Sequence, residues 1–536
     1  MEKINGRKLS LIFIFILILL VIALLVGKFT YSYLGPTISD DLETQGEVTA
    51  SGDTLIFTKG NNLSLSATTD NFTTGGANLT STTNPKVKLV ASTKTNQASA
   101  TYYVGVVINS NSYTYTTSDN TAEVILTIKD ENGSNVTSGV DGLTYVTSGG
   151  VSGFDVTGKT GLFNIKTDYP ISTTSSSTGT THTWTFTLTF VNLGTDQSEN
   201  ENAKMSVDIY LQKSSEFPST LADVCSDGDN LSECITTLSQ KSVSPVSKIY
   251  YHDSTLANGA GDNSYRYAGA SESVNNFVCF GSTASPCPID NLYRIIGVMD
   301  NKVKLIKYDY MTTSELGTDG DYSMTGKEWK MDSSYKGTYG DGEKIGVYHW
   351  NNNAECNTWS TSLLNKTNLN TNFINNIGND WSNKIAVTTW KVGGNTWAKV
   401  GSATPAMAYQ NEITIPDATN STDNATEYEA KVGLMYVSDY GFAAMPSDWT
   451  KTMSSYSSAI NNNWMYMGLY EYTITRISDD GDFAFSVYDN GNIDIAEAYR
   501  ELGNSDGAPV RVTFNLQSSV TYVSGSGSMS DPVRMK

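Results

Sequence analysis

Aromatic rings and short polar side chains gather near the C-terminal end of the 536-residue chain. Trp464, Tyr466, Tyr470 and Tyr472 recur at even spacing, which predicts a row of rings on one face of a strand. Such rings stack on the apolar faces of sugars or peptides, while neighbouring amides and carboxylates bond hydroxyl groups. The alternative is that the rings fill a core, and Trp464 is expected there. The predicted ligand-binding residues are Tyr466, Tyr470, Tyr472, Asp489, Asn490, Asn492 and Asp494.

The histidines argue against the common hydrolytic centres. The sequence contains His182, His252 and His349, and none is near another. A zincin-type peptidase needs two histidines one helical turn apart and a glutamate base. Serine and cysteine hydrolases need a histidine beside the nucleophile, and for His349 and Cys356, which are close in sequence, we expect a structural role. No catalytic residue and no bound metal is predicted, and the chain is not expected to be an enzyme.

Acidic residues suggest two further kinds of site, a glycoside hydrolase centre and a calcium site. Asp439, Asp448 and Glu471 lie among aromatic residues and could act as the paired carboxylates of a glycoside hydrolase, although we expect solvated loop acids. Asp-rich turns at 319–321, 341–343 and 479–482 could hold calcium, but none completes a twelve-residue EF-hand loop. No cofactor is predicted, and calcium stays open as an alternative to plain turns.

Five cysteines suggest oxidation outside the cytoplasm. Cys225 lies close to Cys234, and Cys279 lies close to Cys287, so each pair could close a small loop. Two disulfides, Cys225–Cys234 and Cys279–Cys287, are predicted, with Cys356 left over; the alternative is five buried thiols. Neither spacing is a CxxC, which argues against zinc.

Residues 1–27 predict a membrane segment. Residues 1–8 form a basic leader with Lys3, Arg7 and Lys8, and residues 11–26 are apolar without interruption. Because the basic charge precedes the apolar run, the positive-inside rule places the leader in the cytoplasm and the bulk of the chain outside. Residues 9–27 are predicted as a single-pass signal anchor in the cell membrane. The alternative is a cleaved signal peptide and a secreted protein, although no Ala-x-Ala site follows the run.

The net charge of −20, with only 17% charged residues, argues against a nucleic-acid partner, which requires clustered Lys and Arg. Residues 46–213 contain many strand patterns. In 182–193, for example, Trp184, Phe186, Leu188 and Phe190 alternate with threonines. Strands are also expected at 101–108 and 123–129. This block is predicted to be a β-sandwich, jelly-roll-like in architecture.

Residues 214–245, rich in Ser and with two prolines, are predicted as a linker with a short helix near the first cysteine pair. Residues 246–536 mix strands, helices and long loops. A hairpin is expected from 292–299 and 302–308 across Asp300-Asn301, helices within 359–377, and strands at 431–437 and 464–474. The predicted fold class is therefore mainly β, with an α+β C-terminal domain.

The first block resembles the camelysin-like family, which includes biofilm matrix fibre proteins of Gram-positive bacteria. The resemblance rests on residues 28–34 (KFTYSYL), on the last pair of alternating strands and on the intervening loop 191–197 (VNLGTDQ), and it covers about a third of the chain. It implies a jelly-roll or sandwich that packs at the cell surface, sometimes into fibres, so self-assembly through this block is an expectation. The small-residue processing site usual in the family is not recognisable here.

The second block is similar to a domain of unassigned function found in surface proteins of gut Bacillota and related wall-less bacteria. Four segments carry the similarity: 262–270 (DNSYRYAGA), 292–298 (LYRIIGV), 431–441 (KVGLMYVSDYG) and 463–466 (NWMY). The closing segment 507–511 (GAPVR) is similar to that of C-type-lectin-like folds of the formylglycine-generating-enzyme type, but without their Arg-Pro order. That enzyme's chemistry needs a reactive cysteine pair near the C-terminus, and the last cysteine here is Cys356.

These patterns together predict a non-enzymatic, surface-anchored display or adhesion protein. Its lectin-like C-terminal domain would recognise an extracellular glycan or protein. One alternative is a structural subunit of an extracellular or biofilm fibre. Another is a hypervariable ligand-binding target of a diversity-generating retroelement, which a nearby template repeat in the nucleotide sequence would reveal.

Overall fold

The computed structural model describes residues 45–50, 53–72, 76–213, 216–325, 335–339, 345–351, 356–417, 425–498 and 507–536. The predicted basic leader (1–8) and apolar segment (9–27) lie outside these residues. Along the described part of the chain, no helix combines the length and apolar character needed to cross a membrane.

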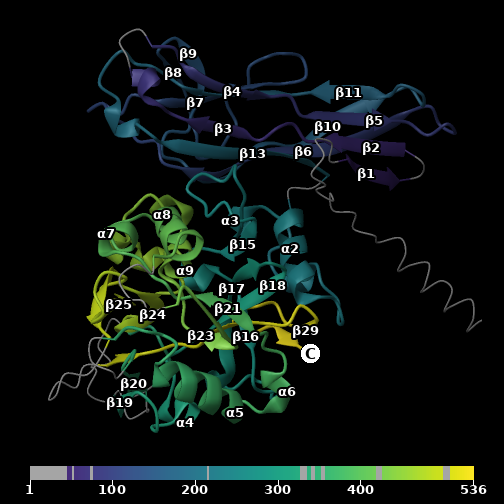
Figure 1. Cartoon of the computed structure of the whole chain (residues 1–536). Coiled ribbons are helices and arrows are strands. Elements are labelled where there is room, and N and C mark those ends of the chain that lie inside the picture. Colours follow the sequence, from purple (N-terminus) through teal and green to yellow (C-terminus); the bar gives the residue numbers. More distant parts are fainter. Residues whose placement is uncertain are drawn as a thin grey trace, which may run out of the picture.

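Antiparallel strands dominate the first block (Figure 1). The strands are β1 (Gln45–Ala50), β2 (Asp53–Thr58), β3 (Leu63–Ser66), β4 (Leu79–Thr83), β5 (Lys86–Val90), β6 (Ala98–Asn111), β7 (Val124–Lys129), β8 (Thr144–Ser148), β9 (Val151–Asp155), β10 (Gly161–Thr173), β11 (Thr180–Thr183), β12 (Thr185–Phe190) and β13 (Lys204–Gln212). The described residues form three sheets, with strand orders β1-β2-β5-β11, β10-β6-β13-β3 and β4-β12-β7-β9-β8. Apolar side chains from all three share one core.

Alternation of side chains accounts for these sheets. In β12, Phe186, Leu188 and Phe190 are fully buried, whereas Thr185 and Thr187 are partly exposed. Since successive side chains of a strand point to opposite faces, this pattern fixes which face of β12 meets the core. Strand β6 contains the strand expected at 101–108 and lies between β10 and β13. The mainly β prediction is confirmed.

The loop between the last two strands of this block is closed around a buried carboxylate. Glu123, which has no exposed surface, accepts hydrogen bonds from Gln197 Nε2 at 2.8 Å and from Asn200 Nδ2 at 2.7 Å. Gln197 also accepts from the Leu193 amide at 2.8 Å. A buried carboxylate is tolerated only where such donors satisfy it, so the polar residues of this loop serve the fold.

Strands and short helices alternate in the second block. The strands are β14 (Ile249–His252), β15 (Ser264–Tyr267), β16 (Phe277–Cys279), β17 (Leu292–Met299), β18 (Lys302–Lys307), β19 (Tyr322–Thr325), β20 (Gly346–Tyr348), β21 (Thr388–Lys391), β22 (Glu427–Ala430), β23 (Val432–Gly433), β24 (Glu471–Arg476), β25 (Phe483–Val487), β26 (Ile493–Glu497), β27 (Ala508–Pro509), β28 (Thr513–Asn515), β29 (Tyr522–Ser524) and β30 (Arg534–Met535). The largest sheet described has the order β14-β15-β17-β18-β28-β23, with β16 also paired to β17. The predicted hairpin is confirmed as β17 and β18, joined by Asp300 and Asn301 with positive φ angles of 48° and 58°.

The helices of this block are short. They are α2 (Leu231–Lys241), α3 (Ser244–Ser247), α4 (Thr313–Leu316), α5 (Ile374–Asn376), α6 (Asn379–Ser382), α7 (Trp397–Val400), α8 (Pro405–Tyr409) and α9 (Val437–Phe442). Two π-helices, η7 (Leu364–Phe373) and η8 (Gln410–Thr414), and two 3-10 helices, η9 (Pro446–Asp448) and η10 (Met453–Asn462), also belong to this block. Figure 1 shows α7, α8 and α9 grouped at the end nearer the first block, and α4, α5 and α6 at the opposite end. The helices expected within 359–377 are present as η7 and α5.

The segment expected to be a linker, 214–245, is packed into the second block over most of its length. Helix α2 buries Leu231, Ile235 and Leu238 in the same core as the central strands. Its N-cap, Asn230, accepts from the amides of Ser232 and Glu233. Apolar residues at helical spacing gave this segment a face to bury, and burying it removes the freedom that a linker would have.

Two expected strands are shorter than the sequence suggested. Within 464–474, strand geometry begins at Glu471, and residues 464–469 are irregular. Within 431–437, β23 covers Val432–Gly433 and is followed by helix α9. Because 464–469 is not a strand, the predicted row of four rings on one strand face is wrong.

Both predicted disulfides are present in the structure. Cys225 is bonded to Cys234 and Cys279 to Cys287, with Cα–Cα distances of 5.7 and 5.9 Å. Cys356 is free and partly buried. The first bond ties the segment before α2 to that helix, and the second closes the loop that leads into β17.

We expect peptide mapping of the cell-derived protein, alkylated without reductant, to show the same connectivity. Cys279 should appear linked to Cys287 and Cys225 to Cys234, while Cys356 should carry the alkyl group. Prior reduction is the control and should label all five cysteines. Alkylated Cys279 and Cys287 in the unreduced sample would contradict this assignment.

Candidate functional site

Tyr470 and Tyr488 lie side by side at one end of a small antiparallel sheet. In the pairing of β24 with β25, Glu471 lies opposite Val487, so Tyr470 and Tyr488 follow directly at the end of the two strands. Their ring centroids are 4.2 Å apart and their planes meet at 49°. Both side chains are partly exposed, so ring surface remains accessible to solvent.

Asp489 and Asn490 extend from the turn that joins β25 to β26, and both are exposed. Gly491 in this turn has a φ of +86°, a conformation that favours glycine. A Cβ at Gly491 would lie 2.2 Å from Ile460 Cγ2, so the turn packs closely on η10. The turn therefore presents its polar side chains outward while its backbone is fixed against the core.

Hydrogen bonds with three other segments hold this turn in place. The Tyr440 hydroxyl donates to the Gly491 carbonyl at 2.8 Å, and the Tyr466 hydroxyl donates to the Asp489 carbonyl. Asn492 Oδ1 accepts from the Ser457 amide at 2.7 Å. A turn anchored in this way loses little conformational entropy when it binds a ligand.

The group formed by Tyr470, Tyr488, Asp489, Asn490 and Asp494 is called the tyrosine patch below. Burial raises the pKa of Tyr488, and the Asp494 carboxylate adds to the effect. Burial also raises the pKa of Tyr470, with a contribution from Asp489. Both phenols therefore stay protonated at neutral pH, and the Tyr488 hydroxyl donates to the Ile495 carbonyl at 2.8 Å.

Of the predicted ligand-binding residues, the structure brings Tyr470, Asp489, Asn490 and Asp494 together in the tyrosine patch. Tyr466 and Tyr472 are buried, at 4% and 2% exposure, and belong to the core. Asn492 is partly exposed, but its side chain fixes η10 to the turn.

Sequence reasoning missed Tyr488. It directly precedes Asp489-Asn490-Gly491, and an Asn-Gly pair between two strand-like runs is a strong hairpin signature. Pairing the flanking runs across that turn would have placed Tyr488 at the end of β25. The partner Tyr470 directly precedes β24, which pairs with β25 across the turn at 477–482.

The carboxylates considered for glycan hydrolysis are buried and paired rather than solvated. Asp439, Asp448 and Glu471 are each 2–3% exposed. Asp439 bonds Lys304 and Arg266, Asp448 bonds Lys451, and Glu471 bonds Arg511. The expectation that they are solvated loop acids is wrong, because each carboxylate lies in a packed region with a cationic partner. None of the three belongs to the tyrosine patch.

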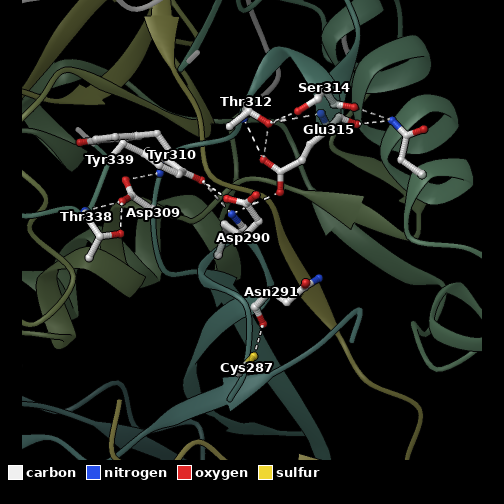
Figure 2. Close-up of polar contacts among 12 residues, drawn as sticks. Cys287, Asp290, Asn291, Asp309, Tyr310, Thr312, Ser314, Glu315, Thr338 and Tyr339 are labelled. Carbon is white, nitrogen blue, oxygen red and sulfur yellow. Dashed lines mark hydrogen bonds and ion pairs between the residues drawn. The ribbon is translucent and has the colours of Figure 1, made fainter. Parts of the chain in front are cut away.

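A second polar cluster surrounds Asp309, at the end of β18 (Figure 2). Asp309 accepts from the Tyr335 hydroxyl at 2.7 Å and from the Thr338 amide at 2.7 Å. Nearby, the Tyr339 hydroxyl donates to Asp290 Oδ1 at 3.2 Å. These carboxylates have donors from the protein itself, so the cluster joins loops together and is not a vacant ligand site.

Buried Lys307 links this cluster to helix α4. Its Nζ lies 3.2 Å from Glu315 Oε1 and 3.4 Å from the Tyr339 hydroxyl. Glu315 and Thr312 form the capping box at the start of α4, visible in Figure 2. The same few side chains thus fix the end of β18, the α4 turn and the loop after the Cys279–Cys287 bond.

The described residues contain no group of three or more His, Cys, Asp or Glu side chains arranged to hold a metal ion. In one of the Asp-rich turns, Asp321 Oδ2 accepts from the amides of Leu363 and Leu364, at 2.7 and 2.9 Å. That carboxylate therefore serves the start of η7. The turn at 341–343 lies outside the described residues.

The histidines lie on separate elements. His252 is buried against Phe442 and Trp449, and its Nδ1 accepts from the Ala260 amide at 3.0 Å. Burial holds the pKa of His252 well below its usual value, with a smaller contribution from Arg266. His182 is partly buried, with its Nδ1 2.9 Å from the Tyr102 hydroxyl.

Comparison of the sequence with protein-family models finds no matching family. Comparison with curated proteins also finds no match. The function is therefore argued from the geometry of the described residues.

Proposed function

We propose that the protein is a non-enzymatic display or adhesion protein, anchored at the cell surface by residues 9–27. Its second block would recognise an extracellular ligand through the tyrosine patch. The observation that carries this proposal is the pairing of two accessible tyrosine rings with exposed Asp489 and Asn490 on a turn that the core holds rigid. The first block would hold the second away from the membrane.

The chemistry of the tyrosine patch favours a ligand rich in hydroxyl groups. Aromatic faces bind the C–H surface of a sugar ring, and the side chains of Asp489, Asn490 and Asp494 accept hydrogen bonds from hydroxyls. Two carboxylates within one small surface disfavour an anionic ligand, because like charges repel. A neutral glycan fits these features better than an acidic glycan or an acidic peptide.

The finer architecture is proposed on the same basis. Three antiparallel sheets sharing one core support a jelly-roll-like sandwich for residues 46–213. For residues 246–536 we propose a C-type-lectin-like head, supported by the similarity of the closing segment 507–511 and by a candidate binding surface in the last third of the block. The disulfides, which both lie in the second block and the segment packed into it, support exposure of that block to an oxidising environment.

The tyrosine patch can be tested by binding of the full-length protein, purified in detergent, to a glycan and protein array. Asp489→Ala combined with Asn490→Ala should weaken binding to the selected ligand about tenfold or more, the effect typical of central contact residues. The melting temperature should stay nearly unchanged, because both side chains are exposed. Tyr470→Ala should weaken binding as well, with a small loss of stability.

Asp479→Ala provides the matched control. Asp479 is an exposed aspartate in the turn between β24 and β25, which leaves the same small sheet at its other end. It should bind like the unaltered protein. If the Asp489 and Asn490 changes also leave binding unaltered, ligand recognition does not occur at the tyrosine patch, and the fibre-subunit alternative gains support.

A further inference from the structure

Lys304 and Asp439 form a close, buried pair at the centre of the second block. Lys304 Nζ lies 2.5 Å from Asp439 Oδ2, and the residues are 6% and 3% exposed. Lys304 belongs to β18, Asp439 to helix α9, and 135 positions separate them in the sequence. An ion pair buried this deeply carries a large desolvation cost, so its geometry calls for an explanation beyond simple attraction.

The Lys304 amine nitrogen lies close to the carboxyl carbon of Asp439. Cγ lies one carbon–oxygen bond, about 1.2 Å, from Oδ2, so Nζ can be no more than about 3.7 Å from Cγ. Productive attack geometries bring the reacting atoms to about 3–3.5 Å. The rings of Tyr436 and Trp390, with centroids 4.6 and 5.7 Å from Nζ, exclude water from the amine.

We propose that Lys304 and Asp439 condense after folding into an intramolecular amide cross-link. A proton passes from the Lys304 ammonium to the Asp439 carboxyl group, and the neutral amine nitrogen forms a bond to Cγ. The attacking nitrogen gives up a second proton to one carboxyl oxygen, the bond from Cγ to that oxygen breaks, and the oxygen leaves as water. The products are one amide and one water molecule. No atom is oxidised or reduced, and no further reactant is needed.

The groups around the pair suit this reaction. Arg266 Nη1 lies 3.4 Å from Asp439 Oδ1, and the Tyr436 amide donates to Oδ2 at 3.0 Å. Both donors can stabilise the negative charge that builds on the carboxyl oxygens when the amine attacks. Burial lowers the pKa of Lys304, which favours the neutral, nucleophilic amine, although Asp439 opposes this effect.

Glu412 is the neighbouring group suited to carry the proton. Its Oε1 accepts from the Ser438 amide at 2.7 Å, directly beside Asp439, and its Oε2 accepts from the Thr475 hydroxyl at 2.7 Å. Burial raises the pKa of Glu412 to about 7, so it can gain or lose a proton near neutral pH. The charge of Glu412 raises the pKa of Lys304, and the charge of Asp439 raises that of Glu412, so Glu412 lies within electrostatic range of both members of the pair.

Condensation also leaves a balanced interior. The reaction removes the charge of Lys304 together with that of Asp439. Arg266 keeps its own partner, Asp262, with Nη2 2.7 Å from Oδ2. A second buried lysine, Lys307, differs in two respects. Its Nζ lies farther from the carboxylate, at 3.2 Å from Glu315 Oε1, and the Glu315 side chain is 19% exposed. We expect no cross-link there.

The test is the mass of the full-length protein after reduction and denaturation. For each protein, the measured mass is subtracted from the mass expected from its sequence. This difference should be larger for the unaltered protein than for Lys304→Arg by the mass of one water molecule. Proteolysis should yield a branched peptide that joins Lys304 to Asp439. On a denaturing gel the unaltered protein should run faster than Lys304→Arg, since a covalent loop keeps the denatured chain compact. A full sequence mass with no branched peptide would overturn the proposal, and this outcome does not depend on whether any variant folds.

Variants assign the roles within the pair. Asp439→Ala should carry no cross-link. Asp439→Asn should form the same amide with loss of ammonia, so its final mass should equal that of the cross-linked natural protein. Glu412→Gln should fold but cross-link at least tenfold more slowly at equal melting temperature, with Glu412→Asp partly restoring the rate. A Glu412→Gln protein that cross-links at the unaltered rate would exclude Glu412 as the proton carrier.

Discussion

Replacing Trp464 with alanine is expected to lower the free energy of unfolding by about 3–5 kcal/mol, the usual range for deleting a large buried ring. The indole is 1% exposed, and its Nε1 donates to the Tyr267 carbonyl at 2.9 Å. The Arg294 guanidinium lies over the same ring, 4.7 Å from its centroid. The substitution therefore creates a cavity, leaves a buried carbonyl without its donor and removes a cation–π contact.

Denaturant unfolding of the full-length protein, followed by near-ultraviolet circular dichroism, would measure this loss. Trp397→Ala is the matched control, because Trp397 is partly exposed and stacks on Phe485 with centroids 6.0 Å apart. Its loss should be clearly smaller. A cost below about 1 kcal/mol for Trp464→Ala would show that this ring is not part of the packed core.

Arg511→Met is expected to be as damaging, at about 3–5 kcal/mol, because it leaves the Glu471 carboxylate buried without its counter-charge. Arg511 Nε and Nη2 lie 2.7 and 2.8 Å from the two Glu471 oxygens, and both side chains are almost fully buried. Burial raises the pKa of Glu471, and Arg511 opposes that rise. Without Arg511, Glu471 must take up a proton or draw in water.

The double variant Arg511→Met, Glu471→Leu removes both members of the ion pair. Comparing it with the single variant separates the effect of losing the pair from the cost of leaving the Glu471 carboxylate buried alone. Replacing both members of a buried ion pair with apolar residues is often close to neutral. We therefore expect the double variant to recover most of the stability that the single variant loses. Equal instability of the single and double variants would mean that Arg511 acts mainly through its bond to the Met465 carbonyl, at 2.7 Å.

Short-range sequence patterns predicted a hairpin, a strand and two disulfides correctly, because the residues that determine these features are close together in the sequence. The hairpin of β17 and β18 follows from two apolar runs around Asp300-Asn301, and β12 follows from strict alternation. The disulfides could be predicted because the cysteines of each pair are close in sequence. In each case the information lies within about ten residues.

Residues 464–469 show where this approach fails. Their apolar and aromatic composition is typical of a strand, yet distant side chains determine their conformation. Arg511 donates to the Met465 carbonyl, and the Tyr310 hydroxyl bonds both the amide and the carbonyl of Leu469. Such contacts span 40 to 160 positions and leave no local pattern to read.

The residues considered for the candidate site fall into the same two groups: some could be predicted from the local sequence, and others only from the three-dimensional packing. Asp489 and Asn490 could be predicted as exposed because Asp-Asn-Gly marks a turn. Tyr466 and Tyr472 are the same residue type as Tyr470, and only the three-dimensional packing shows that their side chains are buried. The Lys304–Asp439 pair could not have been found from the sequence, since nothing near either residue points to the other.

Strand β28, residues 513–515, lies between β18 and β23 in the middle of the largest sheet of the second block. Because the chain is synthesised from its N-terminus, this strand is made almost last. Until then β18 and β23 have open edges, which are prone to pair with other chains. The second block therefore cannot complete this sheet until residue 515 has been synthesised. Prematurely terminated chains that stop before this strand would keep these open edges and would be prone to aggregate.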